Sequence, residues 1–225
     1  MKNLKFYTIV AITFIAVSIN AQFGITAKGG AYIPVGEFAD SYTTGMGGEI
    51  TFIYATNPSF QFGITTGYSH YSADQDVLKE RILEDLTDDL EQINIDATIN
   101  VEAPLNVIPI LFNIKYLFGN KNFKPYFFFE GGVFFYDLAT KGHVEITNGP
   151  TKDIPETAEN RNSTMLGIGG GLQYKITKKL FIDFSAKWSI MNNIKLVETD
   201  VNEDLSGTDK TAQTIGVLGG FSYYF

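Results

Sequence analysis

The chain of 225 residues contains no cysteine, only two histidines and few charged side chains, which make up 19 % of it. The absence of cysteine excludes disulfide bridges and thiolate metal sites. Basic residues number 17 against 25 acidic ones, and the net charge of −8 argues against nucleic acid as a partner. The chain is instead rich in aromatic residues and glycine, with 19 Phe, 12 Tyr and 22 Gly. This composition favours closely packed, bent strands over helices.

Long apolar runs are also missing, except for one at the start of the chain. Two lysines precede an apolar run from Phe6 to Val17, and the small residue Ala21 stands at the expected cleavage position of a secretory signal. The run is too short to span a bilayer as a helix. We therefore expect residues 1–21 to be a signal peptide and residues 22–225 to be one exported domain.

Eight segments of the exported part alternate between apolar residues and small or polar ones. They cover residues 22–33, 46–56, 60–71, 105–118, 123–137, 164–176, 180–191 and 211–225. Short turns follow the second, fourth and sixth segments. Long connections follow the first, third, fifth and seventh segments, at 34–45, 72–104, 138–163 and 192–210. This alternation is typical of an outer-membrane barrel with periplasmic turns and extracellular loops. The sequence therefore predicts an all-β fold, an eight-stranded antiparallel up-and-down transmembrane β-barrel.

The two faces of each segment distinguish this barrel from a soluble, lipocalin-like one, which would turn its apolar residues inward. One face carries Ile, Phe, Leu and Tyr throughout, and an eight-stranded interior has room for only one well-packed set of side chains. So many aromatic residues fit better outside, in lipid. The opposite face, which we expect to line a closed lumen, carries a network of paired charges: Lys28, Glu49, Lys115, Glu130, Asp183 and Lys187.

Aromatic residues gather where the strands end, as expected of interfacial girdles. The girdle near the short turns is predicted to contain Tyr54, Phe60, Phe62, Tyr116, Phe118, Phe123, Tyr126, Tyr223 and Phe225. The outer girdle is predicted to contain Tyr68, Tyr71, Tyr136 and Trp188. Lysines lie in or beside the short turns, at Lys121, Lys124, Lys178 and Lys179, whereas residues 72–104 are strongly acidic.

Several stretches resemble the small outer-membrane β-barrel proteins, the PorT-like group and more distantly the OmpA/OmpX-like eight-stranded barrels. They are the Asn20-Ala21-Gln22 junction, the opening GITAKGGAYIPVGEF, the GMGGEI stretch and the terminal FSYYF. The resemblance implies a cell outer membrane location and assembly by the barrel-insertion machinery. It also implies that the terminal strand is the assembly signal, carried by Phe221, Tyr223 and Phe225. It implies no single activity.

Few residues suggest chemistry. His70 and Ser72 form an HxS pair that is similar to the catalytic pair of lipid A deacylase barrels, and a lipid A-modifying hydrolase using them is the alternative function. His143 is expected in a solvent-exposed loop. The glycine-rich GIGGG stretch lacks the helix and the Lys-Ser/Thr of a phosphate-binding loop, so we interpret it as relief of crowding in a narrow lumen. We expect no catalytic residues, cofactor or metal.

The connection 72–104 has a helical segment within it. From Asp74 to Ile93 the apolar residues recur at helical spacing, Asp74 can cap the start, and the polar face is acidic. This helix either folds over the barrel mouth or docks a partner protein. We therefore predict a monomeric, non-enzymatic barrel in contact with outer-membrane lipids and the barrel-assembly machinery. Its role is structural or interactive, at the cell surface or as an accessory of an envelope complex, and residues 72–104 are the expected contact with a partner.

Overall fold

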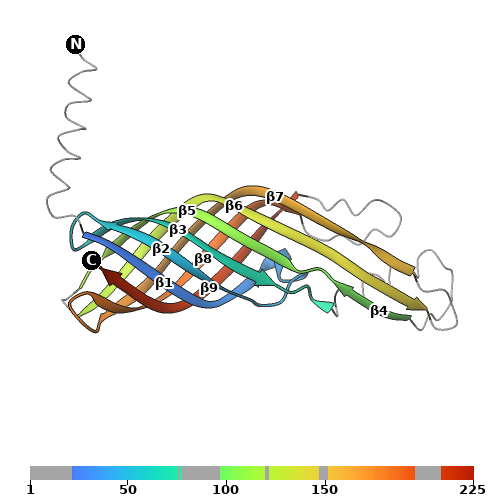
Figure 1. Ribbon diagram of the computed structural model, residues 1–225, viewed down its shortest axis with the longest axis horizontal. Coiled ribbons are helices and arrows are strands. Elements are labelled where there is room, and N and C mark those ends of the chain that lie inside the picture. The colour runs from blue at the N-terminus through green and yellow to red at the C-terminus, as the bar shows by residue number, and fades with distance from the viewer. Residues whose placement is uncertain (1–21, 76, 78–96, 120–121, 147–151, 196–208) are drawn as a thin grey trace, which may run out of the picture.

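Eight antiparallel strands close into a single barrel. The computed structural model describes residues 22–75, 77, 97–119, 122–146, 152–195 and 209–225 (Figure 1). The barrel strands are β1 (Gln22–Val35), β2 (Gly45–Ala55), β3 (Phe60–Tyr71), β5 (Leu105–Leu117), β6 (Phe123–Ile146), β7 (Lys152–Lys175), β8 (Leu180–Lys195) and β9 (Asp209–Tyr224). Each pairs with its neighbours along the chain, and β9 pairs with β1 to complete the ring. The predicted eight-stranded antiparallel barrel is confirmed.

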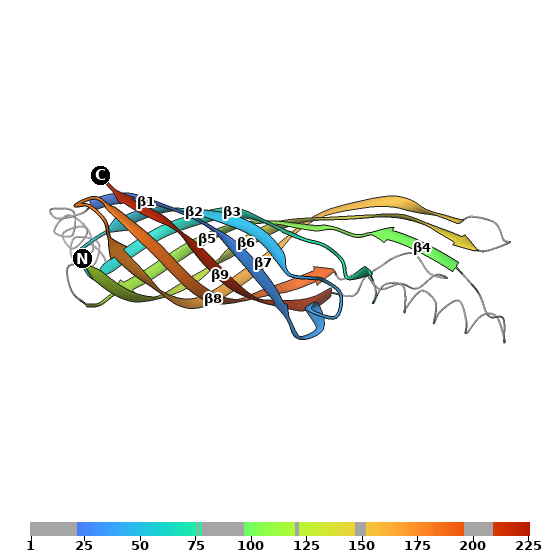
Figure 2. The same cartoon turned by 90° about the horizontal axis from the view of Figure 1, so that it is seen from below.

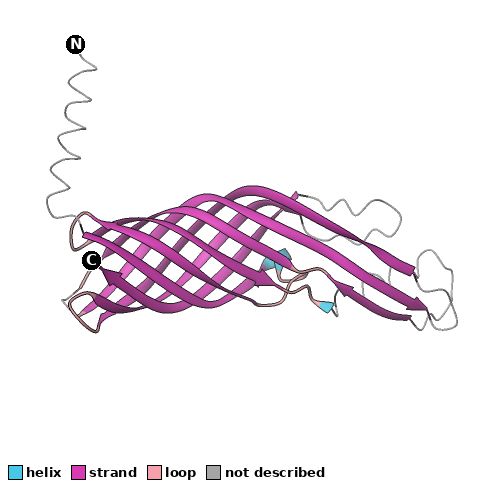
Figure 3. Ribbon diagram, in the orientation of Figure 1, coloured by secondary structure: helices cyan, strands magenta, loops and turns pink. Residues whose placement is uncertain are grey.

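The short turns lie together at one end of the barrel, beside both ends of the described chain (Figure 1). Almost all of the described chain is strand, as Figure 3 shows, and the 3-10 turn η2 (Gly36–Phe38) follows β1 at the other end. In the described residues, helical structure nowhere reaches the length and apolar character that a membrane crossing would need. The predicted signal peptide, residues 1–21, lies outside the described residues.

The outer face of the barrel is an apolar belt. Large side chains with about half of their surface exposed cover every strand; among them are Phe52, Ile64, Phe112, Phe129, Ile168, Phe184 and Val217. A soluble protein does not expose a continuous apolar surface of this extent. The opposite parity of the same strands is buried and holds Glu49, Lys115, Glu130, Asp183 and Lys187. This arrangement excludes the lipocalin-like alternative and places the belt in a lipid bilayer.

Two strands extend far beyond the membrane-spanning part. β6 and β7 are each 24 residues long, about twice the length needed to cross a bilayer. The pairing of β5 with β6 ends at Leu105 and Leu138, so β6 runs on from Leu138 to Ile146, which corresponds to about 27 Å of strand. Most of the region predicted as a loop, 138–163, is therefore a β-hairpin, and the expectation of a loop there was wrong. His143, expected in that loop, is paired in β6 with Asn100.

A ninth strand, β4 (Ala97–Glu102), adds a third member to this projecting hairpin. It continues the line of β5 along β6, and the two are separated by Ala103 and Pro104. Proline has no backbone N–H to donate to a ladder, which explains the break at this point. Figures 1 and 2 both show β4, β6 and β7 rising together past the rim at the end opposite the short turns. The connection 72–104 thus ends in a strand that its acidic composition did not predict.

Candidate functional site

The centre of the lumen holds a three-membered ion cluster. The Lys187 ammonium, from β8, lies 2.8 Å from Glu130 Oε1 on β6 and contacts Glu49 Oε1 on β2 directly. All three side chains are at most 5 % exposed. The Tyr32 hydroxyl, from β1, donates a hydrogen bond to Glu49 Oε1 at 3.0 Å. The cluster therefore ties four strands together across the barrel axis.

A second cluster surrounds Asp183, nearer the short turns. Its carboxylate accepts hydrogen bonds from Tyr126 Oη at 2.5 Å, Gln173 Nε2 at 2.8 Å and Ser222 Oγ at 3.1 Å. The Lys115 ammonium lies 3.7 Å from Asp183 Oδ2 and 4.3 Å from the centre of the Tyr126 ring, a cation–π distance. The charge of Asp183 is thus offset by the nearby Lys115 ammonium and by three hydrogen bonds.

The sixth predicted lumen residue is Lys28. Among the described residues, it has no recorded hydrogen bond to the carboxylates of either cluster. Its ammonium donates to Ser185 Oγ at 2.9 Å and lies 5.6 Å from the centre of the Phe128 ring. All six predicted residues therefore have their charged groups inside the barrel. Five of them pair as Lys187 with Glu49 and Glu130, and Lys115 with Asp183.

Glycines on β7 make the room that these clusters need. A Cβ atom at Gly167 would lie 2.9 Å from Glu130 Cγ, and one at Gly171 would clash with the Tyr126 hydroxyl. The GIGGG stretch thus provides space in the lumen for two side chains of β6.

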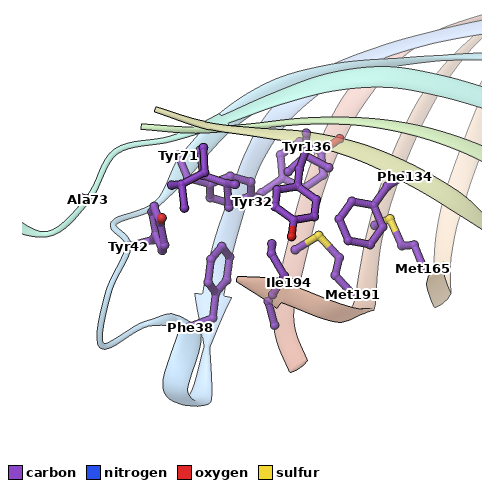
Figure 4. Close-up of a cluster of buried hydrophobic side chains, with 14 of the residues drawn as sticks. Tyr32, Phe38, Tyr42, Tyr71, Ala73, Phe134, Tyr136, Met165, Met191 and Ile194 are labelled. Atoms are coloured by element: carbon purple, nitrogen blue, oxygen red, sulfur yellow. The ribbon is translucent and has the colours of Figure 1, made fainter. Parts of the chain in front are cut away.

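Outer-membrane barrels have their short turns on the periplasmic side and their longer connections outside, so the end with the short turns is taken as periplasmic and the other as extracellular. The extracellular half of the lumen is filled by an apolar plug. Its members are buried aromatic and aliphatic residues from the strands, from η2 and from the segment after it: Tyr32, Phe38, Tyr42, Tyr71, Leu105, Leu111, Phe134, Tyr136, Met165, Met191, Ile194 and Leu218. Phe38 is fully buried, with its ring 5.0 Å from that of Tyr42 and 5.2 Å from that of Tyr71 (Figure 4). Burial raises the pKa of the Tyr42 hydroxyl, which has no hydrogen-bond partner among the described residues. The ion clusters and the plug together leave the lumen filled by side chains.

The periplasmic mouth is hollow instead. A cavity of about 740 Å³ lies between the short turns, and its walls include Gln61, Tyr224, Phe181 and three lysines, Lys124, Lys175 and Lys178. The Lys124 ammonium lies 5.5 Å from the centre of the Phe181 ring.

His70 lies on the outer face of the barrel, at the extracellular end of β3. It is exposed, and its Nδ1–H donates to Asn106 Oδ1 at 2.8 Å; this oxygen also accepts from the Tyr68 hydroxyl at 2.6 Å. Asn106 helps to line a second cavity, of about 520 Å³, with Asp137 and Arg161 among its walls. The group that accepts the hydrogen bond of the His70 ring is therefore an amide oxygen. The backbone carbonyl of Ser72 accepts a hydrogen bond from the Thr43 backbone N–H.

Three of the residues predicted for the aromatic girdles lie in the lumen. Tyr71, Tyr126 and Tyr136 are each 2 % exposed, so their assignment to the girdles was wrong. They have the inward parity of their strands, and the same parity could have identified Tyr32 and Tyr126 as partners of the lumen carboxylates. Tyr68, Tyr116, Phe118, Phe123, Trp188, Tyr223 and Phe225 are exposed on the outer face.

The strand proposed as the assembly signal has both edges paired. β9 lies between β8 and β1, and the Phe225 backbone N–H donates to the Phe23 carbonyl at 2.9 Å. Phe221, Tyr223 and Phe225 point outward, with 57 %, 40 % and 65 % of their surfaces exposed.

Most of the predicted loop helix, 74–93, lies outside the described residues. At its start the Val77 backbone N–H donates to Asp74 Oδ1 at 3.4 Å, the bond expected of a helix cap. Within the described part of the chain, His, Asp and Glu side chains do not gather in threes as a metal site would require.

Residues 8–193 match the model of a family described as "Putative MetA-pathway of phenol degradation". No curated protein sequence matches the chain. Among solved structures, the chain is similar to a major outer membrane protein from Thermus thermophilus, with 13 % identity, a TM-score of 0.49 and coverage of 91 % of this chain and 99 % of that one. Neisserial surface protein A has 14 % identity, a TM-score of 0.47 and coverage of 92 % and 99 %. Ail of Yersinia pestis has 13 % identity, a TM-score of 0.43 and coverage of 91 % and 97 %.

Proposed function

The chain belongs to the family described as "Putative MetA-pathway of phenol degradation", and we propose that this member is a non-enzymatic interaction protein. It is an outer-membrane barrel, because its closed ring of antiparallel strands carries a lipid-facing apolar belt. The predicted class, a small outer-membrane β-barrel, is confirmed, whereas its assignment to the PorT-like group stays a prediction.

The observation that carries the proposal is the sheet of β4, β6 and β7 that projects from the extracellular rim (Figure 2). Beyond the rim, β7 pairs with β6 on one side, while its pairing with β8 begins only at Met165. The described residues place no strand on the other edge of residues 152–164, nor on the outer edge of β4. Unpaired strand edges offer backbone N–H and C=O groups to a further strand.

Such an edge fits one well-understood mode of recognition, in which an extended segment of a partner adds itself to the sheet. Main-chain hydrogen bonds then supply affinity, and side chains of alternate residues supply specificity. β4 ends the connection 72–104, so the sheet and the loop expected to contact a partner meet at the same place. We therefore assign the docking role to the projecting sheet together with this loop.

The filled lumen supports the same proposal, because it argues against a transport function for the barrel. Lys187, Glu49 and Glu130 occupy the barrel centre, and the apolar plug fills the half above them. An eight-stranded barrel filled in this way leaves no aqueous passage. If this protein takes part in the pathway for which the family is named, it would then do so through contacts outside the barrel.

The alternative, a lipid A-modifying hydrolase using His70 and Ser72, has less support. A histidine base in such a site is usually oriented by a third group. For His70 this group is the Asn106 amide oxygen, which also accepts a hydrogen bond from the Tyr68 hydroxyl. His70 and Tyr68, both exposed at the end of the belt, fit an interfacial role better.

The test shortens the hairpin without disturbing the barrel. Ala139 and Ala158 are directly opposite each other in the β6–β7 register. Replacing residues 140–157 by Asn-Gly therefore closes the hairpin at the rim with a two-residue turn. The shortened protein should keep the shift in gel mobility between unboiled and boiled samples that marks a folded barrel.

The readout is the size of the particle extracted from native outer membranes with a mild detergent. We expect the full-length protein in a complex larger than one barrel and its micelle, and the shortened protein as a single barrel. A shortened protein that stays in the larger complex would refute docking through the sheet. A full-length protein that is always extracted alone would refute the interaction role.

A further inference from the structure

The periplasmic mouth of the barrel has the size and the walls of a ligand site. Its cavity of about 740 Å³ falls within the range of small-molecule pockets, about 300–1,000 Å³. Three short turns surround it and contribute Asn57, Gly119 and Lys178. Leu117, Phe118 and Phe181 add apolar surface, so the cavity combines apolar walls with a few polar groups.

The charge of this cavity has one sign. Lys124, Lys175 and Lys178 line it, and none of the residues described as lining it is an Asp or a Glu. Lys124 and Lys175 are half-buried, and the Lys124 ammonium lies close to the ring of Phe181, another wall residue of the same cavity. Three cations around one concave surface raise the local concentration of anions.

A second polar feature belongs to the wall of the same cavity. Gln61 lines the cavity and is 4 % exposed; its amide nitrogen donates to the Tyr224 hydroxyl at 2.9 Å. Its Oε1 atom is buried and accepts no hydrogen bond from the described residues. A buried acceptor without a partner is costly, and a hydrogen-bond donor on a ligand would satisfy it.

We propose that this mouth binds a phosphoryl group that carries a neighbouring hydroxyl, as in glycerol 3-phosphate or the headgroup of phosphatidylglycerol. The phosphoryl oxygens, which are strong acceptors, lie among the three lysine ammonium groups. The hydroxyl donates to Gln61 Oε1, and the carbon skeleton lies against Phe181 and Leu117. The site is separate from the projecting sheet, which lies at the other end of the barrel (Figure 2).

The binding test uses the whole barrel in nanodiscs of phosphatidylcholine, with glycerol 3-phosphate added in isothermal titration calorimetry. We expect saturable binding that weakens as salt is added. Replacing Lys124, Lys175 and Lys178 together by Gln should weaken it by at least about tenfold. Lys179 is exposed in the same turn but does not line the cavity, so Lys179→Gln is the matched control and should bind as the unmodified protein does.

The role of Gln61 is tested with a second probe. Sulfate has the charge of a phosphate dianion but no donor at neutral pH, so Gln61→Met should weaken binding of glycerol 3-phosphate and leave that of sulfate unchanged. Each variant is first checked for the gel shift of a folded barrel. No saturable binding, or equal binding by the triple-lysine variant, would overturn the site. An equal loss for both probes in Gln61→Met would overturn the assigned hydroxyl contact.

The lipid composition of the nanodiscs distinguishes the two possible kinds of ligand, a lipid headgroup and a soluble phosphate ester. If the natural ligand is a lipid headgroup, phosphatidylglycerol in the nanodisc should compete with glycerol 3-phosphate and weaken its apparent binding. If it is a soluble phosphate ester, the binding should be the same in both lipids.

Discussion

Replacing Lys187 by methionine should destabilise the barrel severely. The ammonium of Lys187 is the shared counter-ion of Glu49 and Glu130, and all three groups are buried. Methionine keeps most of the aliphatic volume but leaves the two buried carboxylates without the cation that they share. Removing one partner of a buried ion pair costs about 3–5 kcal/mol. Since whole domains are stable by about 5–15 kcal/mol, this loss would be a large fraction of the total.

The structure also predicts what should offset that loss. Adding Glu49→Gln and Glu130→Gln to Lys187→Met removes the uncompensated charges, so the triple variant should be more stable than the single one. Lys115→Met is the matched comparison, because Asp183 keeps three hydrogen bonds, from Tyr126, Gln173 and Ser222, when its lysine is lost. We expect a smaller cost there, about 1–2 kcal/mol.

The assay is denaturant unfolding in detergent micelles, followed by the fluorescence of the single tryptophan, Trp188. This residue adjoins Lys187 in β8 and is 42 % exposed on the lipid-facing side, so unfolding moves it from detergent into water. The expected order of stability is unmodified, Lys115→Met, then Lys187→Met, with the triple variant above Lys187→Met. Equal stability of Lys187→Met and the unmodified protein would refute the role of the central cluster.

Three further predictions follow from the plug, the last strand and the outer rim. Phe38→Ala empties a fully buried site in the extracellular plug and should cost about 3 kcal/mol of unfolding free energy in the same assay, whereas Glu37→Ala, on the exposed side of the same turn, should be neutral. Deletion of Phe225 removes an outward aromatic residue and a backbone bond to Phe23, and should lower the amount of heat-modifiable protein in outer membranes; normal insertion would count against an assembly signal. His70→Ala should leave the lipid A profile of cells unchanged by mass spectrometry, and an altered profile would favour the hydrolase.

The barrel and its lumen could be predicted because one rule, the alternation of side chains along a strand, governs both. Glu49 and Lys187 share a face with glycine and serine, which identifies that face as interior. Tyr71, Tyr126 and Tyr136 were misplaced when their residue type was given more weight than their parity. A tyrosine in the lumen is stable if its hydroxyl finds a partner, as that of Tyr126 does on Asp183.

The projecting sheet could not be predicted from the same rule. Beyond Leu138 the strands leave the bilayer, so neither face has to be apolar and the alternation disappears. The pairing of β4 with β6 joins residues about forty positions apart through backbone groups, which leave no mark on composition. The cavity at the periplasmic mouth was likewise hidden, because Gln61, Lys124 and Lys178 come from three separate strand ends and turns.

Ion conductance across planar lipid bilayers containing the purified barrel tests most directly whether the protein acts outside its lumen. With Lys187, Glu49 and Glu130 closing the centre and the apolar plug above them, no conductance beyond that of the bare bilayer should be seen at any moderate voltage. Stable, reproducible conductance steps from the pure protein would show that the lumen is open and that the barrel is a channel.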